Sequence, residues 1–240
     1  SCAVSETSRI IDVRASILED NEKHSESLRR SLSNRGVFLV NLLGSPGSGK
    51  TSLLAALLPL LSPPLRPAVI EADLDSRVDA DALEARGWKA VQLRTGGFCH
   101  LDAFMARRGL TELGILPQED GIPGVPNDAG PDSPFDIVFL ENVGNLICTA
   151  QVDTGAHLNL ALLSVPEGDD KPLKYPVMFA KADAVVVTKA DYLDREDFDV
   201  EAVRRRVEGI RPDSRLFTVS ARTGTGMPEL ARFLQEKIRT

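Results

Sequence analysis

The sequence predicts an α/β fold in which helices cover both faces of a mostly parallel sheet, and three observations lead to this prediction. Segments such as VFLVNLLG (37–44) and FDIVFLEN (135–142) are almost continuously apolar, as strands buried on both faces are. Helical segments separate the predicted strands, and alternation of this kind produces parallel sheets. A glycine-rich turn, GSPGSGKT (44–51), joins the first of the two strands to a helix.

The composition sets the size and the class of the protein. Its 240 residues are enough for one α/β domain with a core that needs no disulfides. The net charge of −7 argues against general binding to nucleic acid or to an anionic membrane, because both require a basic surface. No apolar run approaches the roughly 20 residues of a membrane span. No charged and then apolar leader opens the sequence, so we expect a cytoplasmic protein.

The remaining elements follow in a regular order. An amphipathic helix is predicted over residues 9–33, inside an N-terminal segment (1–35) that precedes the main domain (36–240). Residues 113–134 are rich in Pro, Gly and acidic side chains, and we interpret them as an exposed, mobile loop. Further strands are predicted at 66–73, 89–95, 158–165, 182–191 and 214–221, and further helices at 50–61, 78–87, 100–109, 174–181, 198–209 and 226–239.

The turn GSPGSGKT (44–51) has the spacing G-x-x-x-x-G-K-[ST] of a phosphate-binding P-loop, and it lies between a strand and a helix as that motif requires. Its glycines let the backbone wrap closely around phosphates, whose charge the backbone N–H groups and the helix N-terminus stabilise. Lys50 is expected to reach the β- and γ-phosphates, and the Thr51 hydroxyl to bind Mg²⁺. The motif therefore predicts a P-loop NTPase fold with nucleotide contacts from Gly44, Gly47, Ser48, Gly49, Lys50, Thr51 and Ser52.

Two acidic residues end predicted strands on the same rim as the P-loop. Asp73 ends one strand and Glu141 ends another, and ligands of parallel sheets bind at the carboxyl ends of the strands. We expect Asp73 to hold Mg²⁺ directly or through water, with Asp75 as the alternative. Glu141 opens the stretch ENVG, in which Gly144 is placed to sense a γ-phosphate through its N–H. The predicted catalytic residues are Lys50, Thr51, Asp73 and Glu141.

The stretch VVVTKAD (185–191) resembles the N-K-x-D element with which GTPases read their base. The Asp191 carboxylate can accept two hydrogen bonds from guanine, and adenine offers no matching pair of donors. The stem of Lys189 is expected to lie over the base. Thr188 replaces the usual Asn, which we expect to weaken binding without changing base preference. The later SARTG resembles the S-A-K loop that supports guanine O6, through Ser220 and Ala221, so GTP is favoured over ATP.

Together these motifs resemble the nickel-incorporation GTPases of hydrogenase maturation, the HypB family. The resemblance spans most of residues 36–191 and is carried by GSPGSGKTSLL, GGFCHLDAF, LENVGNLIC and SVPEGDDKPLKYPVMFAKADAVVVTKAD. It implies a single P-loop GTPase domain that binds GTP and GDP and forms a homodimer with nucleotide. It also implies two partners, a small nickel chaperone and a hydrogenase large-subunit precursor. Its metal site would consist of Cys99, His100 and Cys148.

The proposed ligands agree with simple coordination chemistry. Thiolate and imidazole bind both Ni²⁺ and Zn²⁺ well, so the residues leave the choice of ion open. Cys99 and His100 are neighbours and can reach in one direction from a loop-to-helix junction, with Cys148 or a second subunit completing the site. The alternative is that the cysteines are small buried hydrophobes. His157 is a further candidate for an outer ligand.

Two departures from the family pattern stand out. Thr149 occupies the position after the second cysteine, where family members usually carry Pro. Many members also have an N-terminal C-x-x-C-G-C motif or a His-rich stretch, whereas this chain starts at SCAVSE. The first departure bears on the shape of the Cys148 loop, and the second on tight metal storage.

The interpretation that unites these observations is a GTP-hydrolysing metallochaperone that gates nickel delivery during nickel-hydrogenase maturation. One alternative is a GTPase chaperone for another metal enzyme, such as urease, or for cobalamin, but related groups place their cysteines differently. Another is a small-molecule P-loop kinase. That class needs a lid and a catalytic base for the acceptor, which we do not find, and Asp191 argues against ATP.

Overall fold

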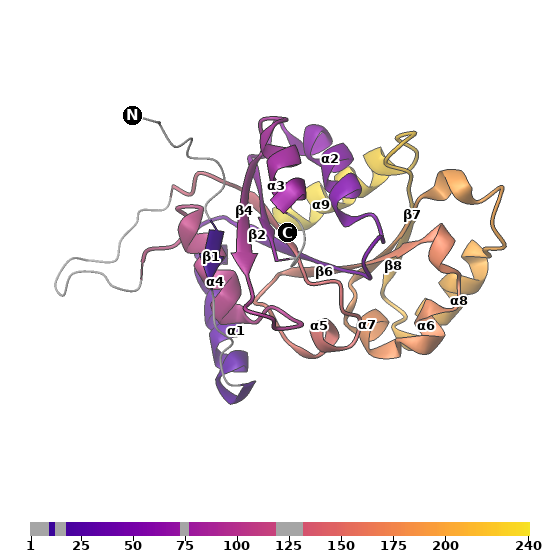
Figure 1. The fold of residues 1–240 in the computed structure, drawn as a ribbon, viewed down its shortest axis with the longest axis horizontal. Helices are drawn as coiled ribbons and strands as arrows, with labels where there is room; N and C mark the ends of the chain where they lie inside the picture. Colours follow the sequence, from indigo (N-terminus) through magenta and orange to yellow (C-terminus); the bar gives the residue numbers. More distant parts are fainter. Residues whose placement is uncertain (1–9, 13–17, 73–76, 119–131) are drawn as a thin grey trace.

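The computed structural model describes residues 10–12, 18–72, 77–118 and 132–240, and these residues form one sheet of eight parallel strands. The strand order is β1-β4-β3-β5-β2-β6-β7-β8. Figure 1 shows β1 and β4 towards one end of the sheet and β7 and β8 towards the other. The predicted α/β fold with a parallel sheet is therefore confirmed. The strands are β1 (Ile10–Asp12), β2 (Phe38–Leu43), β3 (Pro67–Glu71), β4 (Lys89–Arg94), β5 (Ile137–Glu141), β6 (Leu158–Ser164), β7 (Ala184–Thr188) and β8 (Arg215–Thr218).

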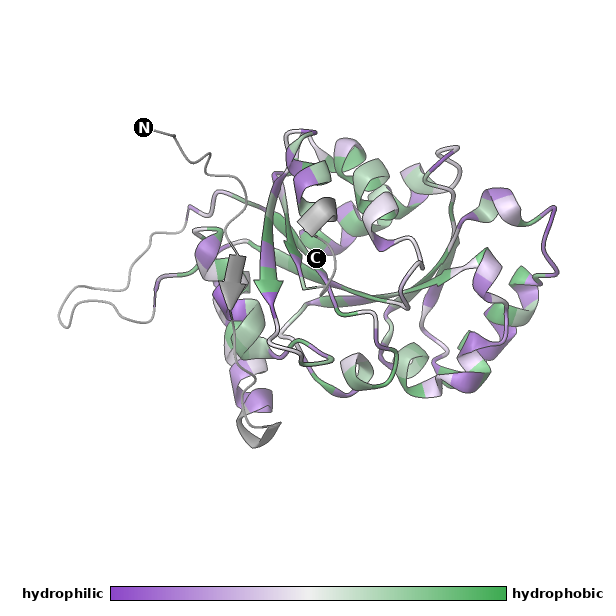
Figure 2. Ribbon diagram, viewed as in Figure 1, coloured by the Kyte–Doolittle hydropathy of each residue, from purple (hydrophilic) through white to green (hydrophobic). Residues whose placement is uncertain are grey.

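Helices cover both faces of this sheet, which explains why its central strands are apolar on both sides. In β2, Val40 and Leu42 pack with α2, α3 and α9, whereas Leu39 packs with α1 and α4 on the opposite face. Figure 2 shows the hydrophobic residues in green along the central strands, with hydrophilic residues mostly on the outer helices. The helices are α1 (Leu18–Asn34), α2 (Lys50–Leu61), α3 (Arg77–Glu84), α4 (Ala103–Glu112), α5 (Cys148–Gln151), α6 (Lys171–Lys174), α7 (Pro176–Lys181), α8 (Val200–Ile210) and α9 (Met227–Arg239). Among the described residues, no helix is both long enough and apolar enough to cross a membrane.

The N-terminal helix is shorter than predicted. Residues 10–12 form the edge strand β1, which pairs with Gln92–Arg94 of β4, and the helix begins at Leu18. The prediction of a helix from residue 9 was wrong because β-branched Ile10 and Ile11 favour a strand where the edge of a sheet offers hydrogen-bonding groups. Leu28 and Leu32 of α1 are buried in the same cluster as the sheet.

The predicted loop at 113–134 also differs from the expectation where it can be followed. Leu113, Ile115 and Leu116 are buried rather than exposed. They extend the apolar face of α4 beyond its last turn, and Ile115 N donates to Leu110 O to close that turn. Residues 119–131 lie outside the described residues.

His157 is a structural residue between β2 and α1 rather than a metal ligand. Its Nδ1 accepts from Leu39 N at 3.0 Å, its Nε2 lies 2.9 Å from Ser33 Oγ, and its ring stacks on Phe38. Because Nδ1 accepts a backbone hydrogen bond, the ring is neutral and carries its proton on Nε2. Burial, together with nearby Arg29, lowers the pKa of His157 from its ordinary value of 6.5.

This arrangement predicts an acid-dependent loss of stability. In the unfolded chain His157 takes up a proton near pH 6.5, whereas the folded chain resists it. Neutral His157 therefore contributes to the free energy of unfolding above that pH. This contribution is lost as the pH falls through the lower pKa of His157 in the folded chain. We expect the melting temperature to fall between about pH 7.5 and about pH 5.5, and His157→Asn to reduce that fall. His24→Asn, which changes an exposed histidine, is the control, and an equal effect of both variants would contradict the assignment.

Candidate functional site

The P-loop connects β2 to α2 in a conformation that only glycine adopts easily. Gly49, which caps α2, has a φ of 89°, in the left-handed region. At Gly44 a Cβ atom would lie 2.5 Å from Ser48 Oγ, so a side chain there would displace the loop. Ser48 itself is fully buried beneath the loop. The backbone is thereby free to approach a phosphate closely, as the motif predicts.

Lys50 folds back over this loop. Its Nζ donates to Gly44 O at 3.0 Å and lies 3.4 Å from Ser45 O, and the side chain is only 5% exposed. The ammonium group is thus held over the concave side of the loop, where it would meet the phosphates of a nucleotide. Ser45 is fixed in turn by the carboxylate of Glu167, which accepts from its hydroxyl.

Thr51 and Glu141 meet at the carboxyl ends of β2 and β5. Thr51 Oγ1 lies 3.2 and 3.3 Å from the two carboxylate oxygens of Glu141, which is 3% exposed. The loop after β5 then returns to the P-loop, since a Cβ on Gly144 would lie only 2.8 Å from Pro46 Cγ. The structure therefore brings three predicted residues, Thr51, Glu141 and Gly144, together beside the P-loop. Asp73 and its alternative Asp75 lie outside the described residues.

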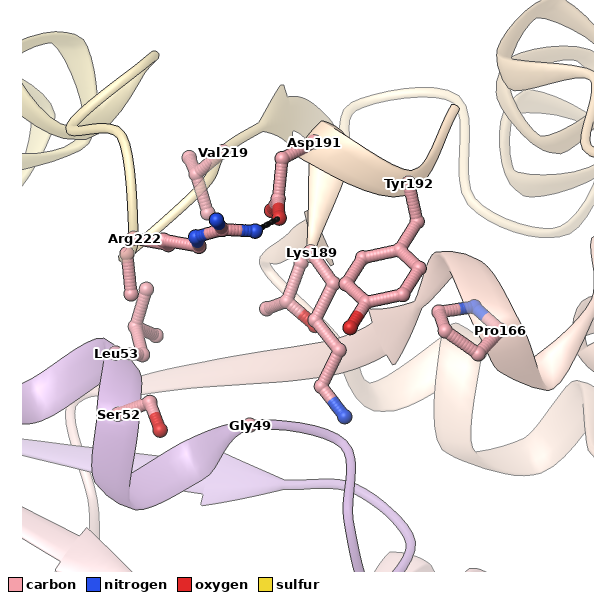
Figure 3. Close-up of a pocket in the computed structure, with 11 residues that line it drawn as sticks. Gly49, Ser52, Leu53, Pro166, Lys189, Asp191, Tyr192, Val219 and Arg222 are labelled. Carbon is pink, nitrogen blue, oxygen red and sulfur yellow. Dashed lines mark ion pairs between the residues drawn. The ribbon is translucent and has the colours of Figure 1, made fainter. Parts of the chain in front are cut away.

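A cavity of about 250 Å³ lies beside the P-loop (Figure 3), and of the predicted base-reading residues Thr188, Lys189, Asp191 and Ala221 line it. Ser220 is fully buried and is not among the lining residues. Asp191 accepts from Ser220 Oγ at 2.8 Å and lies 3.6 Å from Arg222 Nη1. The Ser220 hydroxyl is the main cause that holds the pKa of Asp191 below its usual range, so the carboxylate is an ionised acceptor. The cavity is lined by Gly49, Ser52, Leu53, Pro166, Thr188, Lys189, Asp191, Tyr192, Val219, Ala221 and Arg222.

Thr188 and Lys189 connect this cavity to the P-loop. Thr188 Oγ1 donates to Ser48 O at 2.6 Å, and Lys189 Nζ donates to Gly47 O at 2.7 Å. Figure 3 shows Lys189 extending from the start of the turn that carries Asp191 towards Gly49. A hydroxyl thus braces the P-loop at the position where the usual Asn would do so. Whether the exchange weakens nucleotide binding stays a prediction.

Sequence reasoning missed several residues of this cavity. Leu53, Pro166, Tyr192 and Val219 line it. Leu53 and Pro166 lie within stretches that carry the family resemblance, but no pattern in the sequence assigns any of the four to this cavity. Arg222 is the lining residue that the sequence could have predicted, because it directly follows Ser220 and Ala221 in SARTG. Its position on the far side of Asp191 depends on how the loop after β8 folds over the start of α2.

The predicted metal ligands come together from two loops. Cys99 Sγ lies 3.8 Å from His100 Nδ1, and the nearby Cys148 thiol, with burial as a second cause, raises the pKa of Cys99. His100 precedes α4, which begins at Ala103 rather than at residue 100 because Asp102 caps it by accepting from Met105 N. The expected loop-to-helix junction is present. Within one chain, however, the described residues contain no group of three or more His, Cys, Asp or Glu side chains arranged to hold an ion.

The loop that carries Cys148 is shaped by Asn145. The Asn145 side chain accepts from Cys148 N at 2.8 Å, and its carbonyl accepts from the Thr149 hydroxyl. Thr149, the departure from the family's Pro, is therefore used as a side-chain donor within the turn. Large apolar side chains flank the cysteines and continue onto α6 and α7, and all are at least 41% exposed: Phe98, Ile147, Leu173 and Val177.

The sequence matches one protein family. A model for the CobW/HypB/UreG nucleotide-binding domain matches residues 38–218, which include the P-loop, both cysteine-bearing segments and the base-reading turn. The match covers the sheet from β2 to β8.

Individual relatives agree with that description. The chain is 40% identical over 230 residues to the hydrogenase maturation factor HypB of Azotobacter chroococcum, covering 96% of this chain and 70% of the relative. It is 39% identical over 227 residues to the hydrogenase/urease maturation factor HypB of Helicobacter hepaticus, covering 95% and 88%. Among solved structures, HypB from Helicobacter pylori in complex with nickel superposes with a TM-score of 0.80 at 35% identity, covering 92% of this chain and 95% of the other.

Proposed function

The chain belongs to the CobW/HypB/UreG family, and from that premise we propose that it is a GTPase metallochaperone that gates nickel delivery during nickel-hydrogenase maturation. One observation carries the proposal. The loop after β5 follows Glu141, which lies beside the P-loop Thr51, and leads to Cys148, whose thiol is close enough to Cys99 to raise its pKa. A single short segment therefore connects the place where a γ-phosphate would bind to the place where a soft metal ion would bind.

GTP hydrolysis depends mainly on the positioning and stabilisation of phosphate charge. We assign the stabilisation of that charge to the P-loop N–H groups and Lys50, and the positioning of the attacking water to Glu141, the buried carboxylate beside Thr51. The Thr51 hydroxyl and the Glu141 carboxylate are hard oxygen donors that suit Mg²⁺. Bound Mg²⁺ would supply positive charge to the phosphates. We assign it to Thr51 and, from the sequence alone, to Asp73, with Glu141 as the carboxylate beside Thr51.

The base-reading cavity selects guanine. Ionised Asp191 offers two carboxylate oxygens to guanine N1–H and N2–H₂, and a base without that pair of donors leaves a desolvated acceptor unpaired. Ser220 fixes the orientation of this carboxylate, and the stem of Lys189 forms one wall of the cavity. This chemistry disfavours the small-molecule ATP kinase.

The metal ion is cargo, and Cys99, His100 and Cys148 are its proposed ligands. Three protein ligands leave an open coordination position, which favours transfer over permanent storage. Nickel is the proposed cargo, and zinc binds the same donor types. We propose that a homodimer completes the site, because the exposed apolar residues Phe98 and Ile147 flank it and a two-fold axis can bring equivalent ligand sets together.

The proposed partners follow from this role. A small nickel chaperone loads the site, and a hydrogenase large-subunit precursor receives the ion. The cytoplasm is the proposed location, because thiolate ligands stay reduced there. The Helicobacter hepaticus relative is named for both hydrogenase and urease, so delivery to a urease is the alternative outcome when the target is tested.

The proposal predicts that nucleotide changes metal affinity. We expect wild-type protein titrated with Ni²⁺ or Zn²⁺ to differ by about tenfold, or about 1.4 kcal/mol, between GDP and a non-hydrolysable GTP analogue. Cys99→Ala and Cys148→Ala should each lose this binding. If both variants bind metal as wild type does, the cysteines are core packing and the metallochaperone loses its site. If the variants lose metal binding but the metal affinity of wild type is the same with both nucleotides, the metal site is supported and the nucleotide switch is excluded.

A further inference from the structure

Helix α1 contacts both segments that carry the predicted metal ligands. Asn21 on this helix is 4% exposed, and its amide makes two hydrogen bonds over long sequence distances. Nδ2 donates to Asp153 O at 2.8 Å, and Oδ1 accepts from Ala103 N at 3.0 Å. Ala103 opens α4 directly after the Cys99–Asp102 segment, and Asp153 follows α5, which begins at Cys148.

On the α5 side, the contact extends beyond Asn21. Arg29, also on α1, binds both carboxylate oxygens of Asp153 at 2.8 Å and donates to Ala156 O at 3.0 Å. A Cβ on Gly155 would lie 2.8 Å from Leu28 Cδ2, so this segment packs against α1 without a gap. Backbone, ion pair and packing therefore fix the segment after α5 to one helix face.

On the α4 side, Asn21 completes the N-terminal cap. The first N–H groups of a helix have no partner inside the helix. Asp102 accepts from Met105 N at 2.8 Å, and Asn21 accepts from Ala103 N. The start of α4, and with it the short segment back to Cys99, is thus held by a side chain of α1 as well as by its own cap.

We infer that Asn21 is a positioning residue that holds the Cys99 and Cys148 segments in register, so that the two thiols meet. It contacts neither ligand and acts through the backbone of both segments. Arg29 supports it on the Asp153 side. The inference rests on the proposed function only where nickel is concerned, because the meeting of the thiols can be measured without metal.

The test compares Asn21→Ala and Asn21→Asp with wild type in a Cys2→Ser background, which leaves Cys99 and Cys148 as the thiols. Asn21→Asp keeps an acceptor for Ala103 N–H, loses the donor to Asp153 O and places a negative charge against that carbonyl oxygen. The first measurement is the reaction with phenylarsine oxide, which forms two As–S bonds to a close pair of thiols and releases water. The second is Ni²⁺ affinity together with the thiolate-to-nickel absorption band. The third measurement is GDP affinity, and an affinity equal to that of wild type shows that the nucleotide site is folded.

We expect both variants to bridge the thiols more slowly, to bind Ni²⁺ about tenfold more weakly, as loss of an outer partner of a metal site commonly does, and to bind GDP normally. Ser33→Ala is the matched control, because Ser33 on the same helix loses a side-chain bond to His157 but touches neither cysteine segment. Variants that match wild type in both thiol bridging and Ni²⁺ binding would overturn the inference and leave the proposed function intact. Slower bridging in a protein whose wild type binds no nickel would support the inference and overturn the metal site.

Discussion

Replacing Lys50 by alanine is expected to lower the rate of GTP hydrolysis by roughly a hundredfold to a thousandfold, the loss seen when a positioned transition-state donor is removed. Lys50 Nζ is held over the P-loop by Gly44 O and Ser45 O, within reach of the phosphates. Its charge opposes the charge that spreads over the γ-phosphoryl oxygens as the bond breaks. Nucleotide binding should weaken as well, because the same ammonium contacts the ground-state phosphates.

The measurement is phosphate release under saturating GTP, with circular dichroism to show that the fold is retained. Lys50→Met serves as a second variant, because it keeps the length of the buried side chain without its charge. Lys23→Ala removes an exposed lysine from α1 and should hydrolyse GTP normally. Near-normal turnover of Lys50→Ala would exclude the P-loop as the phosphate site.

Replacing Asp191 by asparagine is expected to change the base preference from guanine to xanthine. The carboxylate of Asp191 only accepts hydrogen bonds, whereas an amide can donate to the additional oxygen of xanthine. GDP affinity should fall by about a hundredfold, because a site built to bind a donor pair discriminates strongly against a mismatch. Since Ser220 holds the pKa of Asp191 below its usual range, the guanine preference of wild type should persist under mildly acidic conditions.

Competition between GDP and XDP on wild type and variant provides the measurement. Asp194→Asn, which changes an exposed acid close in sequence, is the matched control and should keep its guanine preference. An Asp191→Asn protein that still prefers GDP would mean that TKAD does not read the base. The assignment of GTP over ATP would then depend on family membership alone.

The parts of the site that the sequence predicts well are those built within a few residues of backbone. GSPGSGKT determines its own turn, because Gly44 and Gly49 stand where a side chain would collide or strain the backbone. TKAD lies at the carboxyl end of β7, which its sequence predicts, although the contacts of Thr188 and Lys189 with the P-loop span about 140 residues and depend on the strand order. The central strands are predicted equally well, because burial on both faces requires apolar residues at nearly every position.

The parts that local patterns in the sequence do not predict depend on strand order, and only the family resemblance placed Cys99 and Cys148 in one predicted site. Cys99 meets Cys148 because β3 lies between β4 and β5, so that loops from next-but-one strands converge at one rim. Nothing local to either cysteine encodes that order. Arg222 reaches Asp191 for the same reason, through the pairing of β7 with β8. The start of α1 was predicted wrongly because residues 10–12 pair with a strand far along the chain.

The pairing of β1 with β4 affects the tendency of the protein to self-associate. A strand at the border of a sheet presents unpaired N–H and C=O groups to any other chain, and proteins commonly protect such borders. Here β1 covers β4 along Gln92–Arg94, so that β4 is an interior strand along that stretch. Removal of residues 1–12 would uncover the β4 backbone, whose apolar residues Val91 and Leu93 are those that self-associating strands favour. Residues 10–12 thus replace the longer β4 as the border of the sheet with a strand of three residues, and so short a border offers little to intermolecular sheet extension.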